Sequence, residues 1–416
     1  MRAYVLHPEV PSAPGRRDPA AALEEAVALA HALPDLDVVG GEIVRLRRPR
    51  AGLLFGEGKL AEMKARLEEG EVGLVLVDGP VTPVQQRNLE KEWGVKLLDR
   101  TGLILEIFAD RARTREGVLQ VELAALSYQR TRLVRAWTHL ERQRGGLGFV
   151  GGPGETQIEA DRRAIDEAIT RIRRQLAKVV KTRELHRAAR EKVPFPVVAL
   201  VGYTNAGKST LFNRLTGAEV VAEDMLFATL DPTMRGIVLP SGRKVILSDT
   251  VGFISDLPPQ LVAAFRATLE EVLAADVILH VRDISHAASA EQAADVEAIL
   301  AELGVRGEVP LFEVWNKTDL LPPEARSAVE TEAARKDHVV AISALTGDGI
   351  ETLLERVSSA LEEEKTERDL VLGFDEGRRR AWLHEEGVVL SEVQGEDGFT
   401  LRVRWTVRQS KRFAGL

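Results

Sequence analysis

One glycine loop restricts the fold of this chain more than any other feature. It is Gly202-Tyr203-Thr204-Asn205-Ala206-Gly207-Lys208-Ser209, preceded by the β-branched run 197–201 and followed by a helical segment from Thr210. This is the phosphate-loop pattern in the strand-to-helix context that it requires. Loop N–H groups cradle phosphates, Lys208 offsets their charge, and the Ser209 hydroxyl binds Mg²⁺. The loop therefore predicts a doubly wound, mostly parallel sheet that binds a nucleotide.

Two later motifs predict which nucleotide is bound. Asp249-Thr250-Val251-Gly252 follows the apolar run 245–247, which places Asp249 to hold Mg²⁺ through water and the Gly252 N–H near the γ-phosphate. Asn316-Lys317-Thr318-Asp319 follows the run 311–315. The Asp319 carboxylate can accept from guanine N1 and N2, where adenine offers no matching donors. Lys317 can cover the ring, and Ser343-Ala344-Leu345 can present an N–H to guanine O6. We therefore expect the bound nucleotides to be GTP and GDP, with Mg²⁺ as the cofactor.

The loop between these motifs is Phe227-Ala228-Thr229-Leu230-Asp231. We expect Thr229 to complete the metal shell with Ser209 and Asp249 when GTP is bound, with Thr233 as the competing choice. The catalytic residues would then be Lys208, Thr229 and Gly252. Phe253 stands where Ras-type GTPases have a glutamine that orients water, so we predict slow intrinsic hydrolysis, with the missing group supplied by a partner or by another residue.

The distribution of charge singles out one segment. The chain has a formal net charge of −8, yet residues 111–192 hold 19 Lys and Arg against 10 Asp and Glu. A basic segment in an acidic protein fits either solvated helix faces or contact with nucleic acid. The absence of cysteine excludes disulfides and thiolate chemistry, and no apolar run is long enough to cross a bilayer. We expect a cytoplasmic protein that binds neither membranes nor DNA.

The same basic segment has the period of two amphipathic helices. The apolar positions of the first are Leu119, Leu123, Leu126, Leu133, Trp137 and Leu140, and those of the second are Ile158, Ile165, Ile169, Ile172, Leu176 and Val179. They predict a long antiparallel helical hairpin. Its glycine-rich tip, 145–154, carries Leu147, Phe149 and Val150. These apolar groups fit either docking to another surface or a loop folded back onto its own domain.

We therefore expect a multidomain α/β protein. Residues 1–112 form an N-terminal α/β domain with apolar runs at 42–46, 73–77 and 95–98, and residues 113–193 form the hairpin. Residues 194–365, which begin at a proline pair, form the GTP-binding domain, and residues 366–416 form a small α+β domain with a strand at 400–407. We interpret the fragment 56–59, Gly-Glu-Gly-Lys, as a turn that leads into a helix. No interface for self-association stands out, so we expect a monomer.

With their flanking residues, these motifs resemble the HflX family of translation-associated GTPases over nearly the whole chain. The segments that carry the resemblance are 88–90, 99–105, 108–114, 120–124, 152–157 and 161–163, together with the phosphate loop and 227–233.

The resemblance implies binding to the large ribosomal subunit through residues 113–193, splitting or rescue of stalled 70S ribosomes, and hydrolysis stimulated by the ribosome. It also implies that the tip reaches toward the peptidyl-transferase centre, although Phe149-Val150-Gly151 departs from the family pattern there. Some family members are described as binding ATP through the N-terminal domain and remodelling RNA. The alternative function is a GTP-gated switch that binds RNA or protein away from ribosomes.

Overall fold

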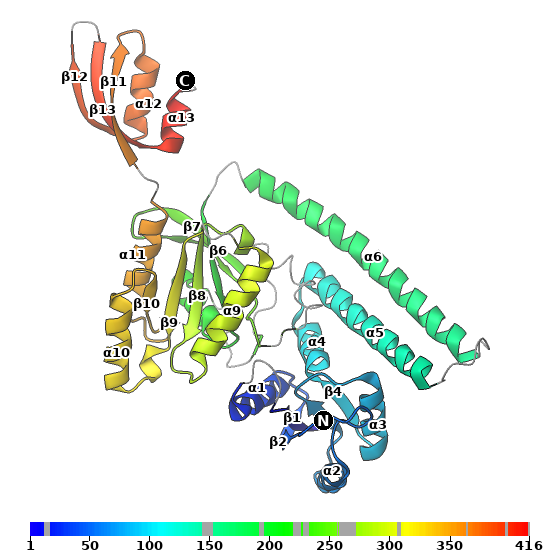
Figure 1. The fold of residues 1–416 in the computed structure, drawn as a ribbon. Coiled ribbons are helices and arrows are strands. Elements are labelled where there is room, and N and C mark those ends of the chain that lie inside the picture. The colour runs from blue at the N-terminus through cyan, green and yellow to red at the C-terminus, as the bar shows by residue number, and fades with distance from the viewer. Residues whose placement is uncertain are drawn as a thin grey trace. The chain divides into compact units, whose positions relative to one another are not determined.

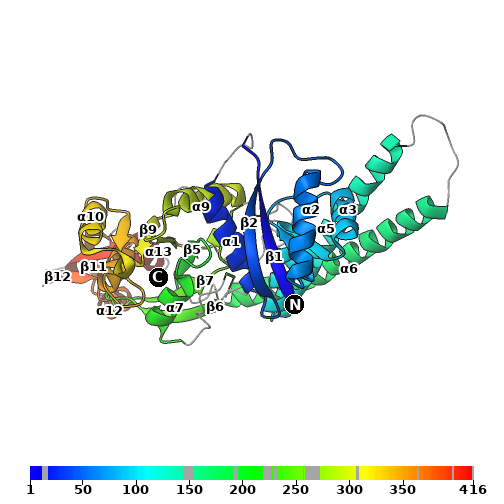
Figure 2. The same cartoon turned by 90° about the horizontal axis from the view of Figure 1, so that it is seen from below.

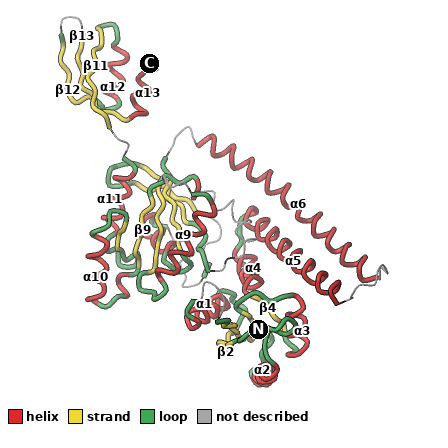
Figure 3. The backbone as a smooth tube through the Cα atoms, viewed as in Figure 1, coloured by secondary structure: helices red, strands yellow, loops and turns green. Residues whose placement is uncertain are grey.

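The computed structural model describes residues 1–11, 17–143, 153–190, 195–218, 226–227, 233–255, 257, 272–305, 309–362, 365–395 and 398–414. They divide into two compact units, Met1–Glu355 and Arg356–Leu416 (Figure 1). Figure 3 colours the helices and strands separately and shows that both units are mixed α/β structures. Within the described ranges, no helix is both long and apolar enough to span a membrane.

The first unit begins with a four-stranded parallel sheet in the order β2-β1-β3-β4. Its strands are β1 (Arg2–Glu9), β2 (Asp37–Arg45), β3 (Leu74–Val77) and β4 (Lys96–Asp99), and its helices are α1 (Pro19–His31), α2 (Glu57–Glu69), α3 (Pro83–Trp93) and α4 (Arg100–Arg111). Alternate strand residues face opposite sides, so Val5 packs in one core with residues of α1 and α4, and Leu6 packs in another with residues of α2 and α3. The predicted N-terminal α/β domain is confirmed as three layers. Gly56 is the N-cap of α2 and residues 57–59 are its first turn, so the fragment 56–59 opens a helix as expected.

Two long helices follow, α5 (Arg115–Gln143) and α6 (Pro153–Arg190). They lie side by side in both views (Figures 1 and 2), and an ion pair of 2.8 Å joins Arg130 of α5 to Asp166 of α6. Ile169 and Ile172 of the predicted apolar stripe are buried. The helical hairpin is therefore present. Of its predicted tip, only Pro153 and Gly154 fall within the described residues, where they begin α6.

The domain predicted to bind GTP contains a six-stranded sheet in the order β10-β9-β8-β5-β7-β6, in which only β6 is antiparallel to its neighbour. The strands are β5 (Val197–Gly202), β6 (Thr233–Val238), β7 (Lys244–Asp249), β8 (Val277–Asp283), β9 (Leu311–Asn316) and β10 (Val339–Ala341). The helices are α7 (Lys208–Thr216), α9 (Ser289–Leu303), the 3₁₀ turn η1 (Thr318–Leu320), α10 (Pro323–Ala334) and α11 (Ile350–Ala360). The predicted doubly wound fold is confirmed, and it brings the ends of β5, β7, β8 and β9 to one edge.

One hydrophobic core runs through the first unit without a break. It contains Leu103 and Phe108 of α4, Val121 and Ala124 of α5, and a group from the GTP-binding domain that comprises Tyr203, Leu226, Phe227, Val251, Phe253 and Ile254. The N-terminal domain, the base of the hairpin and the nucleotide-binding side of the second sheet therefore share buried apolar surface.

The second unit has a separate core. Strands β11 (Lys365–Gly373), β12 (Val389–Gln394) and β13 (Gly398–Thr406) form an antiparallel sheet in the order β11-β13-β12, accompanied by α12 (Gly377–Glu385) and α13 (Val407–Ala414). Leu383, Leu401 and Trp405 are buried in its core. This is the predicted small α+β domain, and β13 coincides closely with the expected strand at 400–407.

Candidate functional site

The phosphate loop connects β5 to α7, and two of its glycines cannot be replaced without a clash. Gly202 has φ +150°, and a Cβ there would lie 2.1 Å from the carbonyl oxygen of Val281 on β8. Gly207 has φ +92°, and its Cβ would lie 2.2 Å from Nδ2 of Asn316. The loop therefore runs against β8 and against the loop that follows β9, in a conformation that only glycine adopts at these two positions.

Lys208 is the first residue of α7 and is buried. Its Nζ donates to the carbonyl oxygen of Tyr203 at 2.7 Å, so the amine turns back over its own loop. Burial lowers the pKa of Lys208 to about 8, although the nearby Asp249 carboxylate raises it. The loop thus holds a partly desolvated cation at its centre.

Ser209 and Asp249 meet across the loop. The Ser209 hydroxyl donates to Oδ2 of Asp249 at 2.8 Å, and Asp249 is fully buried at the end of β7. Thr250, next along the chain, donates its hydroxyl to the carbonyl oxygen of Leu200 on β5 at 2.6 Å, which fixes the start of this segment. Two hard oxygen donors therefore lie together beside Lys208.

The segment that follows Asp249 is bonded to the phosphate loop. Thr204 N donates to the Phe253 carbonyl at 2.7 Å, and Phe253 N donates to the Gly202 carbonyl at 3.1 Å. A Cβ on Gly252 would lie 2.9 Å from Thr204 Cγ2 and 3.1 Å from Lys208 Nζ. The predicted Asp-Thr-Val-Gly motif and the phosphate loop are thus in contact, and Gly252 lies against the buried lysine.

The structure gives a reason for the phenylalanine at position 253. Its side chain is only 2% exposed and belongs to the core shared with the N-terminal domain. A glutamine would leave a polar amide in that apolar environment at a substantial cost in free energy. Position 253 serves packing between domains in this conformation.

The predicted base-binding loops also converge. Asn316, at the end of β9, donates from Nδ2 to the Ala206 carbonyl at 2.8 Å and accepts at Oδ1 from Ala344 N at 2.9 Å. The Ser343 hydroxyl donates to Oδ1 of Asp319 at 2.6 Å. One asparagine therefore joins the phosphate loop to both loops expected around guanine, a role that the motif alone did not indicate.

Other predicted residues of this region have structural partners. Lys317 has a positive φ of 66° and forms a 2.8 Å ion pair with Asp283 at the end of β8. The hydroxyl of the buried Thr318 donates to the Ile342 carbonyl at 3.0 Å, whereas the side chain of Leu345 is exposed. Arg214 of α7, which sequence reasoning missed, donates to the carbonyl oxygens of Ala344 and Leu345.

Only one residue of the predicted loop between these motifs is described. Phe227 is buried, has a φ of 59°, and packs edge-to-face on Phe108 of α4 with ring centroids 4.6 Å apart. The other members, Ala228, Thr229, Leu230 and Asp231, lie outside the described residues. Thr233 begins β6, in register with Asp249.

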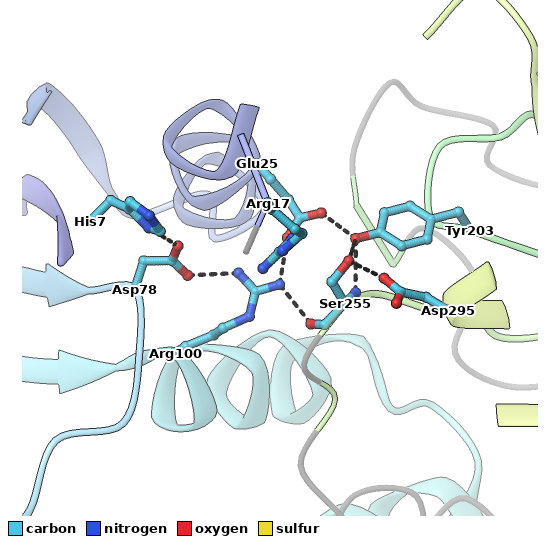
Figure 4. A network of polar contacts seen from close by, with 8 residues as sticks. All are labelled: His7, Arg17, Glu25, Asp78, Arg100, Tyr203, Ser255 and Asp295. Atoms are coloured by element: carbon cyan, nitrogen blue, oxygen red, sulfur yellow. Dashed lines mark hydrogen bonds and ion pairs between the residues drawn. The ribbon is translucent and has the colours of Figure 1, made fainter. Parts of the chain in front are cut away.

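The N-terminal domain also contributes to this site. In the view of Figure 2, α1 lies beside the GTP-binding domain, and a cavity of about 200 Å³ is lined both by α1 residues, including Glu24 and Glu25, and by Thr204 and Asn205 of the phosphate loop. The N-terminal domain also contacts Tyr203 and Ser255 through the hydrogen bonds drawn in Figure 4. These contacts join residues more than 150 positions apart, and no local motif predicts them.

The parallel sheet, the glycine loop, the paired Ser209 and Asp249, and the Asn316-to-Asp319 loop define a phosphate-loop GTP-binding protein. Residues 20–109 and 111–190 match the families described as "GTP-binding GTPase N-terminal" and "GTP-binding GTPase Middle Region", residues 197–317 match "50S ribosome-binding GTPase", and residues 328–414 match "HflX C-terminal domain". A protein named GTPase HflX from Magnetococcus marinus is 52% identical over 368 residues, which cover 88% of this chain and 84% of that protein. The chain belongs to the HflX family of GTPases, and it binds and hydrolyses GTP.

A second relative and a solved structure are also similar to this chain over most of its length. GTPase HflX of Escherichia coli is 45% identical over 88% of this chain and 85% of its own length. Among solved structures, a complex of the protein SsGBP with GDP covers 86% of this chain and 98% of its own at 26% identity and a TM-score of 0.48.

Proposed function

We propose that this protein is a GTPase of translation that binds the large ribosomal subunit, splits or rescues stalled 70S ribosomes, and hydrolyses GTP faster on the ribosome than alone. The observation that carries the proposal is the exposed basic face of α6. Among residues 159–179, whose burial the structure describes, the exposed cations are Arg162, Arg163, Arg171, Arg173, Arg174 and Lys178. Between Arg162 and Lys178 the only acidic residues are Asp166 and Glu167, so this stretch is suited to a polyanion such as rRNA.

The nucleotide would bind at the edge where the four motifs meet. Residues 202–210 would hold the phosphates, and Asp319 would bind guanine, with Lys317 over the ring and residues 343–345 at O6. Since Ala344 N already donates to Asn316, a guanine O6 would compete with that side chain for the proton. The loop from Phe227 to Asp231 would become ordered when GTP is bound and loosen after hydrolysis.

The site also suits Mg²⁺. The donors present are a hydroxyl oxygen of Ser209 and a carboxylate of Asp249, and small hard cations prefer such oxygens. We assign Ser209, Thr229 and, through water, Asp249 as its ligands. The ion would offset charge on the β- and γ-phosphates, while Lys208 and the Gly252 N–H would hold the γ-phosphate.

Slow hydrolysis by the isolated protein follows from Phe253. Its buried side chain has no group that can orient an attacking water, so the missing contribution would come from the ribosome. This is the basis for expecting stimulation by large subunits. The protein is expected to act as a cytoplasmic monomer, without DNA or membranes as partners.

The test measures GTP turnover of the full chain alone, with small subunits and with large subunits, together with cosedimentation in the GTP state. We expect stimulation and binding with large subunits only. The double variant Arg173→Glu and Arg174→Glu should weaken binding by about tenfold or more, because each lost phosphate contact lowers a salt-dependent affinity. It should leave turnover of the isolated protein unchanged.

A matched control is Arg47→Glu with Arg48→Glu, an exposed arginine pair after β2 in the N-terminal domain. If both double variants lose the same affinity for large subunits, the attraction depends on general charge. The hairpin would then not be the binding site. If large subunits do not bind or accelerate hydrolysis, the alternative of a GTP-gated RNA- or protein-binding switch replaces the ribosomal function. A subsequent assay for separation of 70S ribosomes into subunits tests the splitting step.

A further inference from the structure

The first helix of the hairpin, α5, is bonded to the N-terminal domain through one arginine in its second half. Arg132 forms a 3.1 Å ion pair with Asp99 at the end of β4. Its guanidinium also donates to the Tyr128 hydroxyl at 2.5 Å, to the side-chain oxygen of Gln86 on α3, and to the carbonyl oxygen of Val81 at 3.4 Å. A single side chain of the hairpin thus reaches β4, α3 and the loop before α3.

Tyr128, one turn earlier on α5, contacts the same carboxylate. Its hydroxyl donates to Asp99 Oδ2 at 2.5 Å, and the Arg132 guanidinium lies over its ring, 5.2 Å from the centroid. Burial and the Asp99 carboxylate raise the pKa of Tyr128, so the hydroxyl remains a donor. Asp99 is 6% exposed, and its second oxygen accepts from Gly102 N at 2.8 Å. Both carboxylate oxygens are therefore bonded inside the protein.

The acceptor on α3 is also fixed in place. Gln86 donates from Nε2 to the Leu97 carbonyl of β4 at 2.7 Å and to Glu90 Oε1 at 3.1 Å. The same Glu90 oxygen accepts from Leu97 N at 3.1 Å. The planar, forked guanidinium therefore meets acceptors whose positions are set before it arrives, an arrangement that suits arginine better than lysine. We call Gln86, Asp99, Tyr128 and Arg132 the hairpin anchor.

The hairpin continues well beyond this anchor. Helix α5 ends at Gln143, about 16 Å further along at the rise of an α-helix. A tilt of about 20° at Arg132 would move that end by about 6 Å over this length. The ion pair between Arg130 and Asp166, which joins α5 to α6, connects side chains that are 44% and 41% exposed and so contributes little to stiffness at the base. A small change at the anchor is thus amplified toward the tip.

We propose that Arg132 is a positioning residue for ribosome splitting: the hairpin anchor fixes the direction of the hairpin relative to the N-terminal domain, so that the two act as one rigid lever. Attraction of the basic α6 face to rRNA needs only cations close to phosphates, and it survives a loose joint. Separation of two subunits needs displacement to pass along the hairpin, and a joint that bends transmits less of it. This role rests on the ribosomal function proposed above, whereas the direction of the hairpin can be measured without ribosomes.

The first measurement determines how firmly the hairpin is held. Because the chain contains no cysteine, spin labels can be attached at introduced cysteines alone. One pair is Glu68→Cys on α2 with Ala160→Cys on α6, and a reference pair is Glu68→Cys with Glu92→Cys on α3, all at exposed positions. Pulsed electron spin resonance gives the distribution of distances in each pair. In Arg132→Gln the α2-to-α6 distribution should become broader, and the reference distribution should stay unchanged.

The second measurement compares splitting with binding in the unlabelled full chain. For Arg132→Gln, the rate of 70S separation at saturating protein should fall about fivefold, the scale of one lost charged hydrogen-bonded contact. The concentration that half-saturates large subunits should change by less than about twofold, since the exposed cations of α6 remain. GTP turnover of the isolated protein should be unchanged, which shows that the variant is folded. Arg132→Lys keeps the charge beside Asp99 without the fork, and it should recover part of both losses.

Arg130→Gln is the matched control. It removes the same charge from α5 two residues earlier, but it breaks the exposed pair with Asp166 and leaves the anchor intact. Its distance distributions and its splitting rate should match those of the unmodified protein. If it broadens the α2-to-α6 distances or slows splitting as much as Arg132→Gln does, the cause is lost charge and the positioning role is wrong.

The remaining outcomes separate this inference from the proposed function. If the unmodified protein splits 70S ribosomes and Arg132→Gln does so equally fast, or if its α2-to-α6 distances stay narrow, the positioning role of Arg132 is wrong and the ribosomal function stands. If the unmodified protein does not split 70S ribosomes, the proposed function fails. The lever role then fails with it, even where the labels show that Arg132 holds the hairpin.

Discussion

The base-binding side and the phosphate-binding side of the proposed nucleotide site are held in place by different contacts. On the base side, Asn316 bonds Ala206 of the phosphate loop and Ala344, and Ser343 bonds Asp319, all within the GTP-binding domain. On the phosphate side, Tyr203 and Ser255 depend on Glu25 and Arg100 from a different domain. The proposed guanine site is thus held within one domain, whereas the proposed phosphate site is held by contacts from two. Changes on the base side should alter affinity, and changes on the phosphate side should alter rate.

The largest effect is expected from Asp319→Asn. The amide would donate where the carboxylate accepts, leaving the guanine N2 amine unmatched. Both hydrogen bonds from guanine N1 and N2 to the charged carboxylate are affected, so GDP affinity should fall by about 10²- to 10⁴-fold. Calorimetric titration measures this, and the same variant should gain affinity for xanthosine diphosphate, whose C2 carbonyl can accept from the amide. A GDP affinity within threefold of normal would contradict the assignment of Asp319 to the base.

Gly252→Ala should change rate more than affinity. The added Cβ would meet Thr204 Cγ2 at 2.9 Å and Lys208 Nζ at 3.1 Å, which displaces the segment from the phosphate loop. Single-turnover hydrolysis should slow about a hundredfold, as when one transition-state donor is lost, with GDP affinity within a few-fold of normal. Gly236→Ala on β6, where a Cβ would meet nothing within 4 Å, is the control. Equal rates for the two variants would exclude a role for Gly252.

The pH dependence of binding tests the state of Lys208. Its pKa of about 8 without nucleotide lies below the usual 10.5, and bound phosphates favour the charged amine. Below pH 8 the lysine is already protonated, so GDP affinity should be flat. Above pH 8 binding must take up a proton, and affinity should fall by up to about tenfold per pH unit. Titrations between pH 7 and 9 measure this. Lys208→Arg, which stays charged, should lack the dependence, and a flat profile in the unmodified protein would contradict the assigned pKa.

The smallest effect is expected from Tyr203→Phe. It removes the hydroxyl that joins Glu25 to Ser255 but leaves Arg100 in place. Hydrolysis should slow about two- to fivefold, the effect of roughly one neutral hydrogen bond, while GDP affinity stays constant. Tyr4→Phe is the control, since the Tyr4 hydroxyl bonds Arg66 on the other face of the N-terminal sheet. If GDP affinity changes more than the hydrolysis rate, Tyr203 acts mainly in nucleotide binding, as the base-side residues do.

Sequence reasoning located the loops that the structure brings together on the base side, but it did not find the contacts of Tyr203 and Ser255 with the N-terminal domain. The Asn316-to-Asp319 and Gly202-to-Ser209 motifs are contiguous, so their chemistry can be recognised locally, and the helical period of the hairpin is equally visible. Arg100 reaches Ser255 across 155 positions and Tyr203 reaches Glu25 across 178. No spacing or periodicity encodes such contacts. The segment 99–105 stood out in the family resemblance, but the contact of its Arg100 with Ser255 is visible only in the fold.

The continuous core of the first unit has a consequence for unfolding. Leu103 and Phe108 are buried together with Phe253 and Ile254, so separating the N-terminal domain from the GTP-binding domain would expose apolar surface on both. The two should melt in a single cooperative transition, with amides of α4 and β5 exchanging hydrogen at similar free energies. The second unit, with its own core around Trp405, should melt separately. A GTP-binding domain cut out at residues 194–355 would be prone to aggregation, so the natural module for protein engineering is the whole first unit.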